Sequence, residues 1–350
     1  MIRAEPVPFE PPRPPAWARL SGSFRDPSEA EALFFAGAAL SALDSVAKSG
    51  PPWAGVWRSR LALKCAAAVV HSLLNRREDE AALRDAIALA RPGQDLGPAG
   101  WVYAAFRVLA GPGDPFRPKR LAAVAAELQS PLDPDRAANL TALLREAGAG
   151  GRPAPIAAAA AASAVADLRT DAEPLALFCA DAVLAKALNW PVAVPLLAGE
   201  LFLRRATGEG RRPRPGEAGW GKLVALSYAR AALAALDLAQ DLSRRAARLA
   251  DVSPKLRAKG KTGAIKALLA DDAVSAAAPI ANLSDRARRR LFDRLIALGA
   301  ARELTGRPTF RLYGLFCNGP RTVNPFIASS LRRVTLLSVV GARPPPDGIR

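Results

Sequence analysis

Apolar residues recur at spacings of three and four along most of the chain, which is the period of an amphipathic helix. In 26–48, for example, Leu33, Leu40 and Leu43 share one face, and Ser28 can cap the first amides. The same period predicts further helices at 57–74, 79–90, 98–109, 119–128, 134–147, 155–168, 173–188, 194–205 and 222–250. The first 250 residues are therefore predicted to form a helical body.

The pattern changes after residue 282. Ser284 can cap a helix that Gly299 ends. One face of this helix is formed by Ala287, Leu291, Leu295 and Leu298. Two short extended segments follow, 301–304 and 309–313, joined by the turn Thr-Gly-Arg-Pro. We therefore predict an all-α fold, with a multi-helix body followed by a C-terminal winged helix-turn-helix that carries a small β-hairpin.

Proline, glycine and charge divide the chain into four predicted parts. Residues 1–25 are rich in proline and are expected to form a flexible arm. A helical domain is predicted at 26–252 and a winged-helix domain at 253–315. The tail 316–350 lacks a regular pattern, and we expect it to be irregular and disordered.

Positive charge is concentrated near the C-terminal end. The chain carries a formal charge of +17. Between residues 252 and 315, thirteen Lys and Arg residues face five acidic ones, whereas residues 1–251 contribute only about +5 to the total. Such asymmetry is typical of a protein with a polyanion-binding end on a nearly neutral body.

The predicted winged helix provides candidate contacts for double-stranded DNA. In such a module the helix lies in the major groove and the wing lies along the backbone. We predict seven contacts, three from the helix, two from the wing and two from the basic linker that precedes the module. They are Arg286, Arg289 and Arg290; Arg307 and Arg311; and Lys259 and Lys261. The alternative is that this module docks a protein partner, because winged helices also serve that purpose.

Catalytic and cofactor motifs are weak in this chain. It holds one histidine, His71, which excludes zinc helices of the HExxH type and multi-His iron sites. The segment 216–222 matches GxxxxGK, but Leu223 stands where a nucleotide-binding loop needs Ser or Thr for magnesium. Trp53 and Trp57 are predicted to pack in the core. We expect no metal, no cofactor and no enzymatic activity.

The expected location is the cytoplasm. The three cysteines, Cys65, Cys179 and Cys317, are widely spaced, which favours a reducing compartment. The N-terminus lacks the pattern of a signal peptide. No uncharged apolar run reaches about 18 residues, so we expect no membrane partner.

Short sequence segments resemble those of two known families. The segment 298–307, followed by Phe310-Arg311-Leu312-Tyr313, resembles the C-terminal winged helix of Fic-type proteins. From about residue 16 to 315 the chain more closely resembles a bacterial family known as domain of unknown function 1403. The segments that carry this resemblance are 51–58, PPWAGVWR; 78–85, EDEAALRD; 171–177, DAEPLAL; and 310–315, FRLYGL. That family implies no activity.

The Fic resemblance implies a catalytic loop with the pattern HPFx(D/E)GNGR. At the corresponding place this chain has Leu188–Pro195, LNWPVAVP, which lacks the histidine, the acidic metal ligand and the glycines. A relative of that kind would therefore lack the Fic reaction. A nucleotide-handling enzyme of Fic-like ancestry is the third hypothesis, after DNA binding and protein docking.

Overall fold

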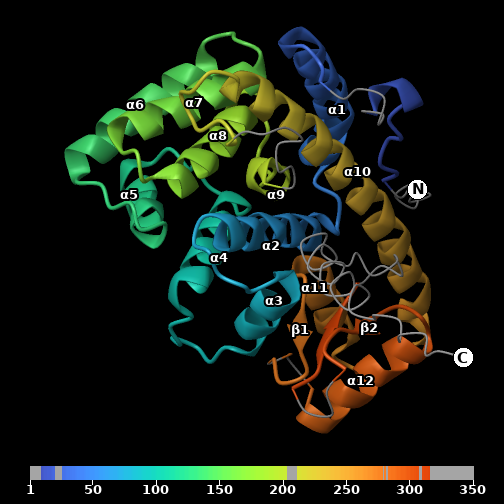
Figure 1. Cartoon of the computed structure of the whole chain (residues 1–350). Coiled ribbons are helices and arrows are strands. Elements are labelled where there is room, and N and C mark those ends of the chain that lie inside the picture. Colours follow the sequence, from blue (N-terminus) through green and yellow to red (C-terminus); the bar gives the residue numbers. More distant parts are fainter. Residues whose placement is uncertain are drawn as a thin grey trace, which may run out of the picture. The chain divides into compact units, whose positions relative to one another are not determined.

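The computed structural model describes residues 9–19, 26–202, 211–278, 280, 283–306 and 310–315. Met1–Leu315 forms one compact unit. This unit is mostly helical and has a small three-stranded antiparallel sheet near its C-terminal end (Figure 1). The predicted tail 316–350 lies outside the described residues.

The body consists of a short 3-10 helix followed by ten α-helices in the part of the chain that is described. They are η1 (Ala16–Ala18), α1 (Glu29–Ser49), α2 (Ala54–Ser72), α3 (Glu80–Leu89), α4 (Gly97–Leu109), α5 (Pro118–Glu127), α6 (Pro134–Ala149), α7 (Ala154–Leu168), α8 (Glu173–Ala187), α9 (Leu197–Leu201) and α10 (Trp220–Val252). The predicted helical body is thus confirmed, with shifts of a few residues at most helix ends.

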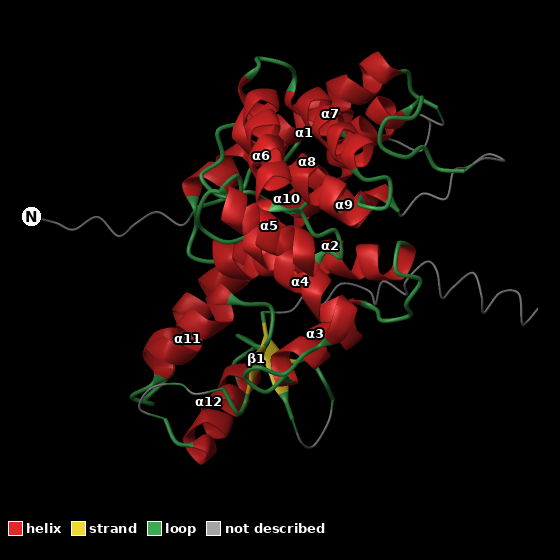
Figure 2. Ribbon diagram, turned by 90° about the vertical axis from the view of Figure 1, so that its left-hand side faces the viewer, coloured by secondary structure: helices red, strands yellow, loops and turns green. Residues whose placement is uncertain are grey.

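The C-terminal elements are smaller. They are η2 (Ser253–Lys255), α11 (Lys261–Ala270), β1 (Val274–Ser275), α12 (Asp285–Ala297), β2 (Arg302–Glu303) and β3 (Leu312–Gly314). Figure 2 shows the sheet as a minor part of a helical molecule, beside α3 and α12.

Two pairs of packed helices and the central helix α2 form the core. α1 packs along α10, and α7 packs along α8 (Figure 1). Between these pairs and the C-terminal elements, α2 contacts α4, α9 and α11. Trp53 and Trp57 near its start are buried, and the Trp57 indole donates a hydrogen bond of 2.9 Å to the carbonyl of Ala235 in α10. The predicted core role of both tryptophans is confirmed.

The described part of the N-terminal arm lies against α10. Apart from η1, residues 9–19 have no regular secondary structure, and Pro15 and Arg19 on either side of η1 have extended backbones. Gln240 donates a hydrogen bond of 2.9 Å to the carbonyl of Pro12, and Arg19 pairs with Asp237 at 2.7 Å. In this segment the predicted flexible arm is therefore bound to the body.

The sheet differs from the predicted hairpin. β3 pairs with both β2 and β1, so that Tyr313 faces Glu303 on one side and Val274 on the other. β1 adds a third strand that the sequence pattern did not reveal, because two residues are too few to show an alternation. Its position comes from pairing with residues about 38 positions further along the chain.

The predicted helix-turn-helix is not seen in the described residues. A helix-turn-helix needs a helix directly before α12. The described residues between β1 and α12 instead form turns, in which Ala278 donates to the carbonyl of Ser275 and Leu283 to that of Ile280. The structure confirms a mostly helical protein with a small sheet near its C-terminal end.

Arg60 of α2 contacts two neighbouring strands, β1 and β3, at one end of the sheet. Its Nε pairs with Asp272, just before β1, at 2.5 Å, and its Nη2 donates a hydrogen bond of 2.7 Å to the carbonyl of Leu315, just after β3. The neighbouring carboxylate of Asp271 accepts a hydrogen bond from Ser59 and pairs with Arg107 of α4 at 3.3 Å. These polar contacts attach the C-terminal elements to the body.

Gly55 permits a close approach beside this attachment. A Cβ added there would lie 2.8 Å from the Cα and 2.9 Å from the carbonyl oxygen of Ala270, at the end of α11. Backbone atoms cannot move aside as a flexible side chain can, so the contact between α2 and α11 requires glycine.

Asp181 of α8 is a buried carboxylate that organises α9. It accepts hydrogen bonds from the amides of Leu196 and Leu197, at 2.9 and 3.2 Å, and from the hydroxyl of Tyr228 at 3.0 Å. The first two satisfy amides at the start of α9, which has no capping side chain of its own. Burial raises the pKa of the Asp181 carboxyl to about 7, while these hydrogen bonds act in the opposite direction.

Replacing Gly55 with Ala should destabilise the protein, because the new methyl group meets the backbone of Ala270. We expect the free energy of unfolding to fall by about 1–3 kcal/mol in chemical denaturation. Gly37→Ala is the matched control, since a Cβ at Gly37 of α1 meets nothing within 4 Å. That variant should be neutral or more stable by about 0.5–1 kcal/mol. Equal stability of the two variants would contradict the close approach.

Asp181 should make stability depend on pH. Its pKa in the folded protein, about 7, lies above the value near 4 of an exposed aspartate, so the folded state binds the proton more tightly. The contribution of this group to the free energy of unfolding is therefore full below pH ~4 and is lost as pH rises towards about 7. In Asp181→Asn this decline should disappear from denaturation curves measured across that range. Asp133→Asn, an exposed cap of α6, should retain it.

Candidate nucleic-acid interface

The ends of α12 form as the sequence predicts. Ser284 accepts a hydrogen bond from the amide of Ala287 at the first turn. The helix ends at Ala297, and Gly299 follows with a φ of +66°, a conformation that glycine adopts without strain.

An aromatic contact fixes the orientation of α12. The rings of Phe292 and Tyr313 of β3 are stacked, with centroids 4.4 Å apart and an interplanar angle of 4°. Leu291 and Leu295 are buried on the same face. Because this face covers the sheet, the arginines on the other side of α12 point outward.

Arg288 is the exception among the arginines of α12. Its side chain is buried, donates to the carbonyl of Ala276 at 3.0 Å and pairs with Asp285. It therefore holds the turn after β1 against the helix and is not available to a ligand.

A groove of about 600 Å³ lies between α12 and the segment that follows α10. Five cationic side chains line it, and we call it the cationic groove. They are Arg286, Arg290 and Arg294 from α12, and Lys255 and Arg257 from the opposite wall. The apolar residues of its lining are Leu256, Ala258, Ala287 and Leu291, and no carboxylate contributes to it.

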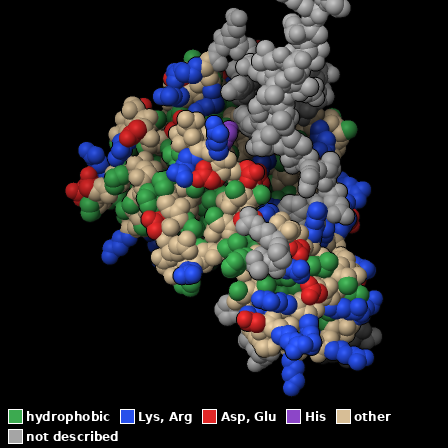
Figure 3. Space-filling model, turned by 60° about the horizontal axis from the view of Figure 1, so that its bottom comes forward, with side chains coloured by type: hydrophobic (Ala, Val, Ile, Leu, Met, Phe, Trp, Pro, Cys, Tyr) green, Lys and Arg blue, Asp and Glu red, His purple; other side chains and the backbone are tan. Residues whose placement is uncertain are grey.

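The five cations of the groove share one feature, the lack of a carboxylate partner. Within the described part of the chain, none of them forms an ion pair. Five like charges on one small surface repel each other, and an anion bound there would relieve that repulsion. In Figure 3, Lys and Arg side chains gather over the lobe formed by the C-terminal elements.

Four of the seven predicted DNA contacts are exposed. Arg286 and Arg290 line the cationic groove, whereas Arg289 and Lys259 are exposed outside it. Arg307 lies outside the described residues.

The two remaining predicted contacts have structural partners. Arg311 lies 3.4 Å from Asp293 and 3.6 Å from Glu303. Lys261 donates two hydrogen bonds of 3.1 Å to the carbonyls of Ser253 and Leu256, which shape the wall of the groove.

Arg294 was missed by the sequence reasoning. It follows Arg286 and Arg290 at a spacing of four, and this i, i+4, i+8 stripe was the signal that could have found it. Lys255 and Arg257 belong to the basic linker but precede the two lysines that we singled out there. Their position opposite α12 depends on the tertiary structure.

The GxxxxGK match has a structural explanation. α10 begins at Trp220, within the match, and the indole of this residue donates a hydrogen bond of 3.1 Å to the carbonyl of Ala159. Lys222 pairs with Asp26 at 2.6 Å. The segment therefore starts a core helix. Among the described residues, no cluster of three or more His, Cys, Asp or Glu side chains could hold a metal ion.

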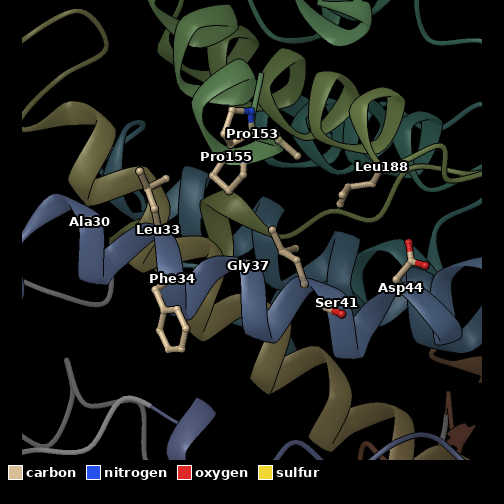
Figure 4. A pocket seen from close by; sticks show the side chains of 11 residues that line it. Ala30, Leu33, Phe34, Gly37, Ser41, Asp44, Pro153, Pro155 and Leu188 are labelled. Atoms are coloured by element: carbon tan, nitrogen blue, oxygen red, sulfur yellow. The ribbon is translucent and has the colours of Figure 1, made fainter. Parts of the chain in front are cut away.

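A second groove, of about 700 Å³, runs along α1 and is mostly apolar, with Ser41 and Asp44 as its polar lining residues. Figure 4 shows Leu33 and Gly37 of α1 on one side, with Pro153 and Pro155 across from them. We call it the α1 groove. Phe34 lines it with 59% of its surface exposed, and its ring lies 5.8 Å from that of Trp17, which is 62% exposed.

Two helices are long and apolar enough to span a membrane, judged by length and composition alone. They are Glu29–Ser49 and Trp220–Lys255, with 44% and 67% of the apolar window buried. These two helices pack against each other in the unit described above. Core helices of a soluble protein meet the same criterion, so the observation is weak support for a membrane span.

Comparison with known proteins places the chain in a family. No curated protein and no solved structure matches it, so the Fic-type resemblance of the C-terminal segment gains no support. The family described as "Protein of unknown function (DUF1403)" matches residues 6–315. Because that match covers most of the sequence, this protein belongs to the DUF1403 family.

Proposed function

We propose that this protein binds double-stranded DNA through the cationic groove and acts as a DNA-binding regulator. The observation that carries the proposal is a groove with five cations, no carboxylate in its lining and no ion pair to any of the five among the described residues. Duplex DNA carries one negative charge per ~1.7 Å of its axis, and neutralising it releases bound counterions. This release favours binding to a surface of this kind.

We further propose that residues 261–315 form a variant of the winged helix. The order α11, β1, α12, β2, β3 and the strand order β1-β3-β2 support this assignment. In this variant, the described residues between β1 and α12 form turns where the standard module has a helix. The connection between β2 and β3 would be the wing.

DNA binding of the full chain should depend on the groove. In Arg290→Ala/Arg294→Ala, two of five phosphate contacts are lost. Each phosphate contact releases about 0.9 counterions. Between 50 and 200 mM salt, the affinity of the wild type for a duplex should therefore fall by a factor of about 500, and the affinity of the double variant by a factor of about 40. Fluorescence anisotropy with a labelled 20-bp duplex would measure both.

The matched control removes two exposed arginines from the body, Arg91→Ala/Arg152→Ala, with the same change in net charge. Its salt dependence should equal that of the wild type. If both double variants lose affinity equally, binding reflects net charge alone and the groove is not the site. If the wild type shows no binding at low salt, the proposed function is wrong.

The α1 groove supports a second candidate function, protein interaction. Exposed apolar surface with adjacent large aromatic side chains, here Trp17 and Phe34, is typical of protein-binding surfaces. The occupant that we propose is a second copy of α1. Its first turn carries Glu29 and Glu31, and its last turn carries Lys48, which pairs with Asp44 at 2.9 Å within the helix. Antiparallel packing about a two-fold axis would bring opposite charges together at both ends. Gly37, near the middle, leaves room for a partner side chain.

Self-association through α1 should be lost in Phe34→Glu, because the substitution places a charge in the apolar contact. Sedimentation equilibrium over a concentration series should show dimers of the wild type and monomers of the variant. Leu168→Glu, at another exposed apolar position, should remain dimeric. A wild type that is monomeric at high micromolar concentration would reject this candidate.

A further inference from the structure

Both walls of the cationic groove carry positive charges that line the same space. We propose that the groove holds the sugar-phosphate backbone of one DNA strand and that the protein binds duplex DNA without reading its sequence. This inference rests on the DNA binding proposed above. It differs from the usual docking of a winged helix, in which the helix following the turn enters the major groove and contacts base edges.

The spacing of the α12 wall fits a phosphate backbone. Arg286, Arg290 and Arg294 lie four residues apart, so each step advances ~6 Å along the helix and the three together span ~12 Å. This span is long enough for the three guanidinium groups to contact successive phosphates of one strand, whose path winds around the duplex axis and is longer than the axial rise of ~3.4 Å per nucleotide. One row of guanidinium groups can therefore follow one strand.

The opposite wall neutralises the same strand from its other side. Lys255 and Arg257 come from the segment after α10, and the apolar lining between the walls includes Leu256 and Leu291. Apolar side chains there would contact sugar rings, which carry no sequence information.

The lining also lacks several of the groups that recognise bases. It contains no aromatic side chain on which a base could stack and no Asn or Gln for a bidentate contact with adenine. Its arginines can also contact guanine, but with cations on both walls they meet the phosphates of a strand in the groove first. Affinity should therefore come from the backbone alone.

The outward face of α12 is poorly suited to the major groove. On a helical wheel with 100° per residue, Asp293 falls between Arg286 and Arg289, in the middle of the exposed face. Its carboxylate is 55% exposed, and that of Asp285 is 78% exposed. Insertion of this face would bring both carboxylates into the negative potential of the duplex, whereas backbone contact through the groove side leaves them in solvent.

The test compares sequences and variants with the full-length protein. Kd values for AT-rich, GC-rich and mixed 20-bp duplexes should agree within about threefold, and selection from a random duplex pool should enrich no motif. The slope of log K against log salt should be about −4.5 for the wild type and about −2.7 for Arg286→Ala/Arg290→Ala, with the same loss for every sequence. Arg289→Ala, on the same helix but outside the groove, should lose at most a fewfold in affinity and show no change in preference. Circular dichroism and thermal melting would verify that the variants fold.

The outcomes separate this inference from the proposed function. An enriched motif bound about 100-fold more tightly than other sequences, or a preference altered by Arg289→Ala, would overturn the backbone inference while DNA binding stands. Tighter binding of single strands than of the duplex would also overturn it, since single strands release only ~0.7 counterion per contact and find no stacking platform here. If no duplex is retained at low salt, the proposed function itself fails.

Discussion

A single guanidinium group, that of Arg60, connects the C-terminal elements to the helical body. It pairs with Asp272, just before β1, and donates to the carbonyl of Leu315, just after β3, at the same end of the sheet, and both charged side chains are almost buried. A buried ion pair of this kind adds little net stability, but the loss of one partner leaves an uncompensated charge that costs about 3–5 kcal/mol. The contact therefore determines where the sheet lies and gives a strong penalty for any other arrangement. α12 packs on that sheet through the stacked rings of Phe292 and Tyr313, so the direction of its arginines follows from the same attachment.

The distribution of carboxylates explains which cations are available to a ligand. The C-terminal region has an excess of basic residues, and its few acids are engaged in the fold: Asp272 with Arg60, Asp285 with Arg288, and Asp293 with Arg311. The cations that remain include the five of the cationic groove. The excess of positive charge in the sequence thus becomes a localised site, because the carboxylates form ion pairs with other basic residues of the fold. Net charge alone would not have distinguished Arg290 from Arg288, two positions apart, of which one is exposed and the other buried.

The parts of the fold that could be predicted are those with local signals. Ser28 and Ser284 cap α1 and α12 as predicted, because a capping side chain bonds to an amide only a few residues away. The predicted helix 194–205 proved to contain only the short α9 in its described part, whose start depends on Asp181, a residue from another helix. β1 is defined by strand pairing across a long stretch of sequence. In both cases the deciding contact is distant along the chain, and a pattern of apolar spacing carries no information about it.

In the candidate site, too, the sequence predicted what depends on neighbouring residues and missed what depends on contacts between distant segments. The outward direction of Arg286, Arg289 and Arg290 followed from helical periodicity, but only two of them line the groove, because its second wall comes from the segment after α10. Two basic side chains hold the walls in place rather than contacting a ligand. Lys261 donates to two carbonyls of the segment after α10, and Arg248 of α10 donates to the carbonyl of Leu298 at the end of α12, at 3.0 Å.

The width of the groove is consequently set by the body. One wall continues directly from α10, a helix of 33 residues that runs through the core, and the other is attached through the sheet and Arg60. A polyanion between the walls would contact both walls at once. Its binding would therefore stabilise the arrangement of the C-terminal elements as well as neutralise their charge. A groove whose two walls are both attached to the body suits a ligand with regularly spaced charges and variable bases, because the backbone of DNA changes less from one sequence to another than its base edges do.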